Sequence, residues 1–80
     1  MTKKETYEKL EEVFHDIFDD ESIVLKDTTT AEDIEDWDSL EHINLIVAVE
    51  KSFGIKFTMG EVTGMKNVGE MADIIEERIK

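Results

Sequence analysis

Helix-capping patterns constrain the fold of this 80-residue chain more than any other feature of its sequence. At the start of each of four segments that we expect to be helical, a Thr, Asp or Asn stands three residues before a Glu: Thr2 and Glu5, Asp38 and Glu41, Thr58 and Glu61, and Asn67 and Glu70. In such a capping box each of the two side chains accepts a hydrogen bond from the other residue's backbone N–H. The chain also has no proline and no strand-like alternation of apolar residues. We therefore predict an all-α fold, a small four-helix bundle with three main helices and a short third one.

The spacing of apolar residues predicts which face of each helix is buried. The first helix begins after Thr2 and carries a stripe at intervals of three and four residues: Tyr7, Leu10, Val13, Phe14, Ile17 and Phe18. The second runs over residues 39–53, ends at Gly54, and has one apolar arc: Leu45, Ile46, Val49 and Phe53. The third carries Val62 and ends near Gly64, and the fourth has a single apolar face: Val68, Met71, Ala72, Ile75 and Ile79.

A long loop, residues 19–37, joins the first two helices, and loops of this length usually are functional or hold structure of their own. The segment 30–33 has the pattern of one capped helical turn, and four loop residues can cover the core: Ile23, Val24, Leu25 and Ile34. His15 lies one helical turn from several acids, so we expect it to be solvated and paired with a carboxylate. Trp37 and His42 have the spacing of a hydrophobic staple around the start of the second helix.

Ser39 occupies the first position of that helix, directly after the predicted N-cap Asp38. The N–H groups of a first helical turn lack partners within the helix, and the helix dipole adds positive potential there. Phosphate groups bind readily at such helix ends. An exposed serine at this position is therefore suited to hold a phosphoester.

The net charge of −12 is unevenly spread, because residues 1–38 hold 14 acids and 4 bases and residues 39–80 hold 7 acids and 5 bases. Nucleic acids and anionic membranes need a basic surface, so we expect neither as a partner. We also expect no metal site, since there is no cysteine and the acids at 16, 19, 20 and 21 lack the spacing of a calcium loop. The sequence predicts one free-standing domain over residues 1–80, monomeric and cytoplasmic, with neither a signal peptide nor a membrane span.

Residues on both sides of Ser39 match a known pattern. They are Asp38-Ser39-Leu40, then Ile43, Leu45, Ala48 and Glu50, then Phe53-Gly54-Ile55-Lys56-Phe57, and near the end Val68-Gly69-Glu70-Met71. With these residues the chain resembles an acyl carrier protein. The resemblance implies a 4′-phosphopantetheine group on Ser39, next to the motif residue Asp38, whose thiol carries acyl groups as thioesters. It also implies that the chain has no catalytic residues of its own.

The partners implied by the resemblance are a phosphopantetheinyl transferase, an acyl-loading ligase or transferase, and condensing or other acyl-processing enzymes of fatty-acid, polyketide or related biosynthesis. Carried over residue by residue, the partner surface comprises Leu40, Glu41, Ile43, Val47, Glu50 and Glu61. The chain departs from the family in two ways. Asp36 stands where glycine is common, and several positions of the second and third helices that are often acidic in the family are not acidic here: Asn44, Lys51, Met59, Gly60 and Thr63.

Two other functions fit parts of the sequence. Leu40, Ile43 and Val47 form a second apolar strip on the helix, beside the predicted core arc, and could hold a partner helix in an adaptor that is never modified. Ser39, His42 and Asp38 could instead form a nucleophile, base and orienting group. The chain lacks the glycines of a nucleophile elbow and is too short for a deep cleft, so the sequence favours a carrier over an enzyme.

Overall fold

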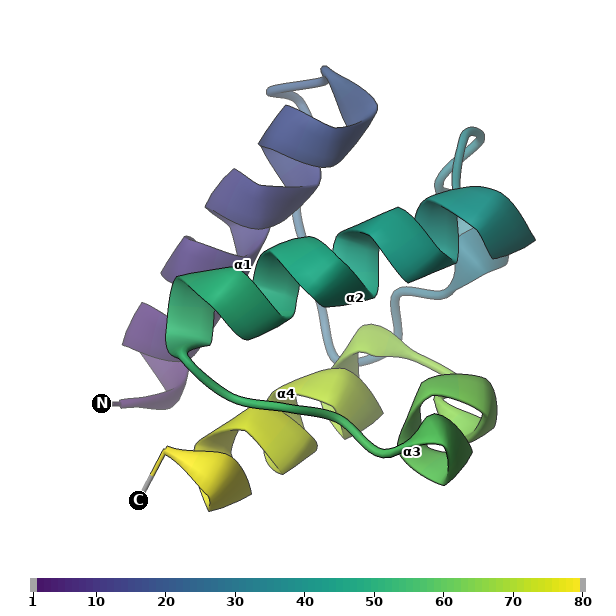
Figure 1. Ribbon diagram of the computed structural model, residues 1–80. Helices are drawn as coiled ribbons and strands as arrows, with labels where there is room; N and C mark the ends of the chain where they lie inside the picture. Colours follow the sequence, from purple (N-terminus) through teal and green to yellow (C-terminus); the bar gives the residue numbers. More distant parts are fainter. Residues whose placement is uncertain (1, 80) are drawn as a thin grey trace.

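The computed structural model describes residues 2–79, and within them the chain forms four α-helices and no strand (Figure 1). The helices are α1 (Lys3–Phe18), α2 (Ser39–Phe53), α3 (Met59–Gly64) and α4 (Val68–Arg78). A single 3₁₀ turn, η1 (Ala31–Asp33), interrupts the long loop between α1 and α2. Helix α1 packs against both α2 and α4, while the short α3 lies beyond the start of α4. The predicted all-α bundle is confirmed.

Side-chain caps set the helix starts where the sequence placed them. Thr2 and Thr58 form complete capping boxes with the Glu three residues later, and Thr30 forms one with Asp33 at η1. Asp38 and Asn67 accept from the backbone N–H three residues on, which is the first half of the box. Glu41 does not make the predicted reciprocal hydrogen bond with the backbone N–H of Asp38. Its carboxylate accepts a hydrogen bond from Asn44 Nδ2 at 3.3 Å instead. Gly54 ends α2 at φ 67°, a left-handed conformation that glycine adopts without strain.

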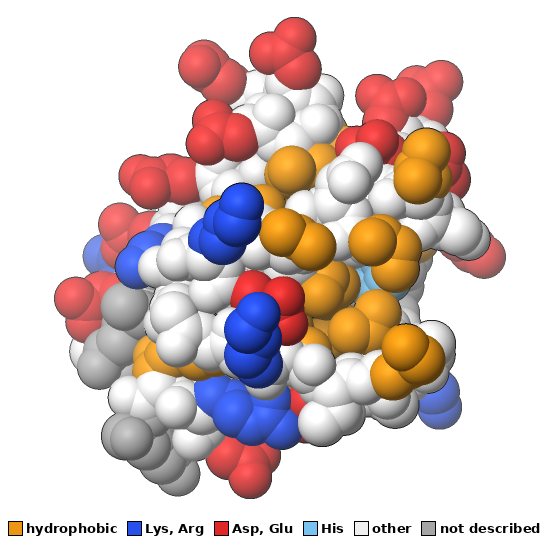
Figure 2. All heavy atoms as spheres, viewed as in Figure 1, with side chains coloured by type: hydrophobic (Ala, Val, Ile, Leu, Met, Phe, Trp, Pro, Cys, Tyr) orange, Lys and Arg blue, Asp and Glu red, His pale blue; other side chains and the backbone are white. Residues whose placement is uncertain are grey.

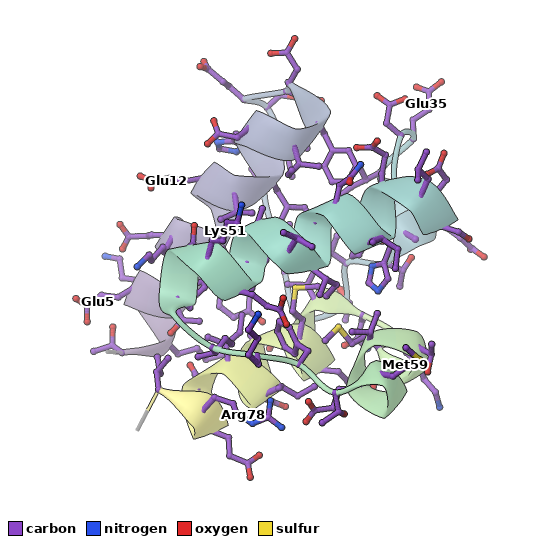
Figure 3. All side chains as sticks on the ribbon, viewed as in Figure 1. Glu5, Glu12, Glu35, Lys51, Met59 and Arg78 are labelled. Atoms are coloured by element: carbon purple, nitrogen blue, oxygen red, sulfur yellow. The ribbon has the colours of Figure 1, made fainter. Side chains whose placement is uncertain are left out.

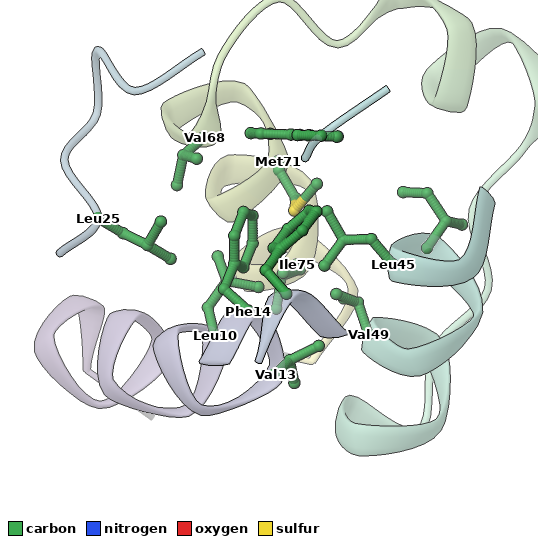
Figure 4. Close-up of a cluster of buried hydrophobic side chains, with 12 residues drawn as sticks. Leu10, Val13, Phe14, Leu25, Leu45, Val49, Val68, Met71 and Ile75 are labelled. Carbon is green, nitrogen blue, oxygen red and sulfur yellow. The ribbon is translucent and has the colours of Figure 1, made fainter. Parts of the chain in front are cut away.

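The core lies between α1, α2 and α4 and is built from the predicted apolar faces (Figure 4). Its fully buried side chains include Leu10, Phe14, Leu45, Val49 and Ile75. Phe53 was predicted to be buried but is only partly covered, because it stands in the last turn of α2, where Lys9 lies over its ring at 5.0 Å from the centroid.

The loop 19–37 is tied to the helices at several points. Leu25 is buried and its N–H donates to Glu11 Oε2 at 2.9 Å, whereas Val24 is 68% exposed, so the prediction that Val24 covers the core was wrong. Successive residues of an extended segment point to opposite sides, which is why only one of this pair reaches the core. Further along, the first two N–H groups of α4 donate to the loop carbonyls of Thr29 and Asp27, at 2.8 and 3.0 Å.

The contacts of His15 also differ from the prediction. Its Nε2 lies 2.8 Å from the carbonyl oxygen of Ile23, and the ring is partly buried. The imidazole therefore fastens the loop to α1 and is not a solvated partner of the nearby acids. Local helical spacing predicted only neighbours on the same helix, and the loop backbone competes successfully for this side chain.

Candidate functional site

Ser39 is the first residue of α2 and is exposed. The preceding Asp38 has an extended backbone, at φ −106° and ψ −173°, and its Oδ1 accepts the N–H of Glu41 at 2.8 Å. The cap thus occupies one N–H of the first turn, and the serine hydroxyl stands beside the positive end of the helix. This is the placement that the sequence predicted for both residues.

Trp37 and His42 enclose the entry to α2. The indole is buried, with its ring centroid 5.2 Å from that of Phe14 in an edge-on arrangement, and it stacks on the imidazole of His42 at 5.9 Å. Its Nε1–H donates to His42 Nδ1 at 3.1 Å. The other ring nitrogen, Nε2, lies 3.0 Å from the carbonyl oxygen of Val62 in α3. The predicted staple is present, and it extends to a third element that the spacing did not indicate.

These contacts remove the arrangement that a serine nucleophile would need. Both ring nitrogens of His42 are engaged, by Trp37 and by Val62. The carboxylate of Asp38 caps the helix and does not orient the imidazole. A general base must have a nitrogen free within hydrogen-bond reach of the proton it removes, and both nitrogens of His42 are already engaged by other groups.

A cleft of about 490 Å³ opens beside Ser39. Its walls come from the end of the loop, the first turns of α2, α3 with the segment after it, and α4. They include Trp37, His42, Ile43, Val62 and, from α4, Met71. Two charged side chains, Asp38 and Lys66, also line it. The lining of the cleft is mainly apolar. Neither Val62 nor Lys66 could be assigned to this site from the sequence, because both follow α2 by many residues.

Large apolar side chains gather on the surface next to the cleft, over α2 and α3 (Figure 2). Leu40 is 70% exposed, Ile43 53% and Val47 44%, and Met59 at the start of α3 is 82% exposed. We call these four residues the apolar face. The strip of α2 therefore lies outside the core, which leaves it available to a partner. Met59 was not predicted as part of it, although its place at the first position of a short helix could have indicated an exposed side chain.

Two of the acids predicted to meet partners are already engaged within the chain. Glu50 Oε2 accepts the N–H of Phe57 at 2.8 Å, and Glu61 Oε2 lies 2.5 Å from Arg78 Nη2. The hydrogen bond from Arg78, with that from the Thr58 N–H, holds the pKa of Glu61 below its usual value. Lys51, in the last turn of α2 (Figure 3), is exposed. The field of this surface is thus less negative than the total charge of −12 suggests.

Neither a metal site nor a membrane span is found in the part of the chain that the structure describes. No group of three or more His, Cys, Asp or Glu side chains within residues 2–79 is placed to hold a metal ion. No helix in the same range is long and apolar enough to cross a bilayer.

Comparisons with known proteins agree on one family. Residues 8–75 match the family model described as a phosphopantetheine attachment site. An acyl carrier protein of Petrotoga mobilis is 34% identical over 80 residues, covering 99% of this chain and 93% of the relative. One of Rickettsia canadensis is 32% identical over 77 residues, covering 96% and 88%.

A solved structure extends the likeness to three dimensions. The solution structure of a holo acyl carrier protein from Geobacter metallireducens superimposes with a TM-score of 0.87 and is 47% identical, over 92% of this chain and 85% of that one. The four-helix arrangement with a long first loop is therefore the arrangement of that protein also.

Proposed function

Because the chain belongs to the acyl carrier proteins of the phosphopantetheine attachment family, we propose that Ser39 carries its 4′-phosphopantetheine arm and that residues 1–80 work as one carrier domain. Acyl carrier proteins are carriers and not enzymes. In this proposal the terminal thiol of the arm holds acyl groups as thioesters, and the chain presents them to enzymes of fatty-acid or related biosynthesis in the cytoplasm.

The observation that carries the proposal is the position of Ser39, exposed at the first residue of α2 and at the edge of the cleft. A transferase would bring coenzyme A and magnesium in its own active site. There the Ser39 hydroxyl would lose its proton to the transferase or to solvent as its oxygen attacks the phosphate that bears pantetheine. A P–O bond of the coenzyme A pyrophosphate would break as the new P–O bond forms, and adenosine 3′,5′-bisphosphate would leave. The helix end then lies beside a phosphodiester whose negative charge its free N–H groups favour.

The apolar face is the proposed docking surface for the transferase, for an acyl-loading ligase or transferase, and for condensing enzymes. Leu40 and Ile43 lie within four residues of Ser39, so a partner that covers them also reaches the arm. Glu41 follows the serine by two residues, and among the described residues its carboxylate has only a long, exposed hydrogen bond, of 3.3 Å, from Asn44. Glu50 and Glu61 are held by contacts within the chain, so we assign the encounter mainly to apolar contact and Glu41.

Intact mass spectrometry after incubation with coenzyme A and a broad-specificity phosphopantetheinyl transferase tests the attachment. We expect the wild type to gain the mass of one phosphopantetheine and Ser39→Ala to gain none. Ser52→Ala is the matched control, because Ser52 is also exposed on α2 but lies near its other end, and it should be modified like the wild type.

Two outcomes would contradict the proposal. A Ser39→Ala chain that still gains the mass would place the arm elsewhere. A folded wild type that gains nothing would favour the unmodified adaptor, because the apolar face would then be the feature left to explain.

A further inference from the structure

His42 joins three elements that are separate in the sequence: the end of the loop, α2 and α3. Trp37 Nε1 lies 3.1 Å from its Nδ1, and the carbonyl oxygen of Val62 lies 3.0 Å from its Nε2. The backbone N–H of His42 also donates to the carbonyl of Asp38 at 2.8 Å, which fixes the base of the side chain in the first turn of α2. The imidazole thus bridges two walls of the cleft beside Ser39.

The two partners allow one protonation state of this ring. An indole N–H only donates, so Nδ1 must accept and carry no proton. A backbone carbonyl only accepts, so Nε2 must carry the proton. The structure therefore requires the neutral Nε2–H tautomer. Adding a proton to Nδ1 turns an acceptor into a donor that faces another donor, and the hydrogen bond to Trp37 is lost.

We propose that His42 is a positioning residue that holds Trp37 and α3 around the cleft while it is neutral, and that its protonation releases Trp37 and makes the shape of the cleft depend on pH. The inference concerns the unmodified chain. It rests on the proposed function in one respect only: the cleft would then lie beside the phosphopantetheine arm on Ser39. Imidazole is the side chain that ordinarily changes charge near neutral pH.

The charged side chains nearest to His42 in the cleft lining come from two places. Asp38 precedes α2, and its Oδ1 is committed to the helix cap. Lys66 follows α3. Glu61, next to Val62 in α3, is paired with Arg78, and Met71, the α4 residue of the cleft wall, is uncharged. The contact with Trp37 is what distinguishes the two protonation states of the ring.

His15 supplies an internal control, because it is the other histidine of the chain. Its hydrogen bond goes from Nε2 to the carbonyl of Ile23, which is an acceptor. That bond survives protonation of the ring, since both nitrogens of a charged imidazole donate. Acid should therefore break a hydrogen bond of His42 and none of His15.

The test is a pH titration of the unmodified ¹⁵N-labelled chain by NMR, between about pH 8 and pH 5, the range that brackets ordinary histidine titration. Trp37 is the only tryptophan, so its indole N–H gives one signal. We expect that signal to move with the same midpoint as the ring signals of His42. The Nε2–H bond of His42 to the Val62 carbonyl survives protonation, so the exchange of the Val62 amide, whose N–H donates to Thr58, should change little over the same range.

Two variants make the result specific. Glutamine offers one acceptor and one donor but does not titrate, so in His42→Gln the indole signal should stay constant with pH. His15→Gln should titrate like the wild type. If the Trp37 indole signal does not change as the ring signals of His42 titrate, in the wild type or in His15→Gln, the proposal is wrong. This result does not depend on whether His42→Gln folds. A His42→Gln chain that followed the wild-type curve would do the same, and neither result would bear on modification of Ser39.

Discussion

Val47 and Val49 test whether the apolar face is a surface, because they are the same residue type two positions apart on α2. Val47 is 44% exposed and Val49 is fully buried. Complete burial of a valine stabilises a protein by about 1.5–3 kcal/mol, so the covered half of Val47 contributes about 1–1.5 kcal/mol. The carboxylate of Val47→Asp remains in water. That of Val49→Asp would be buried without a partner, at a cost of several kcal/mol added to the lost burial.

Urea unfolding followed by circular dichroism measures both costs against a total stability of about 4–12 kcal/mol for a chain of this length. We expect Val47→Asp to keep its helix content and lose about 1 kcal/mol, and Val49→Asp to be largely unfolded. In the same samples Val47→Asp should still accept phosphopantetheine on Ser39 but be loaded more slowly by an acyl-transferring partner. If Val47→Asp unfolds as Val49→Asp does, the strip belongs to the core and the docking surface is wrong.

Three further predictions concern caps, packing and pH. Asp38→Ala should lower the free energy of unfolding by about 1 kcal/mol through loss of the cap, and no measurable change would show that the cap is dispensable. Gly69→Ala should destabilise by about 1–3 kcal/mol, because a Cβ there would lie 2.9 Å from a carbonyl oxygen of the long loop, whereas Gly60→Ala meets open space and should be neutral by the same urea assay. The ion pair with Arg78 lowers the pKa of Glu61, so the stabilisation of the fold by this pair is present above about pH 4.5 and is lost as the pH falls through the lowered pKa. The melting temperatures of the wild type and Glu61→Gln should therefore converge in acid. A difference that stays constant with pH would contradict this.

Helix positions could be predicted from the sequence because their causes are local. Each cap is a side chain that bonds to a backbone group two or three residues away, so Thr2, Asp38, Thr58 and Asn67 mark helix starts by their spacing alone. Gly54 marks an end for a similar reason, since the left-handed conformation there favours glycine. The place of Ser39 at the first residue of α2 follows from the same local rules.

Contacts between elements could not be predicted, because they depend on which surfaces meet. The bond from His42 to Val62 spans 20 residues, and the ion pair of Glu61 with Arg78 spans 17. Nothing in the spacing of these residues distinguishes them from exposed polar side chains. The sequence consequently placed Glu61 on a partner surface by resemblance, while its carboxylate is held by α4.

Ser39 is exposed because it is the first residue of α2, but the loop before it determines which residues surround it. Twenty residues, 19–38, lie between α1 and Ser39, and an untethered segment of that length would let the start of α2 move along the bundle. Bonds from the loop to α1 and α4, and the burial of Trp37 against Phe14, fix its path. Because Trp37 also contacts His42, the last anchored residue of the loop is itself a wall of the cleft. Changing the loop should therefore change what lies beside the arm even where α2 is untouched.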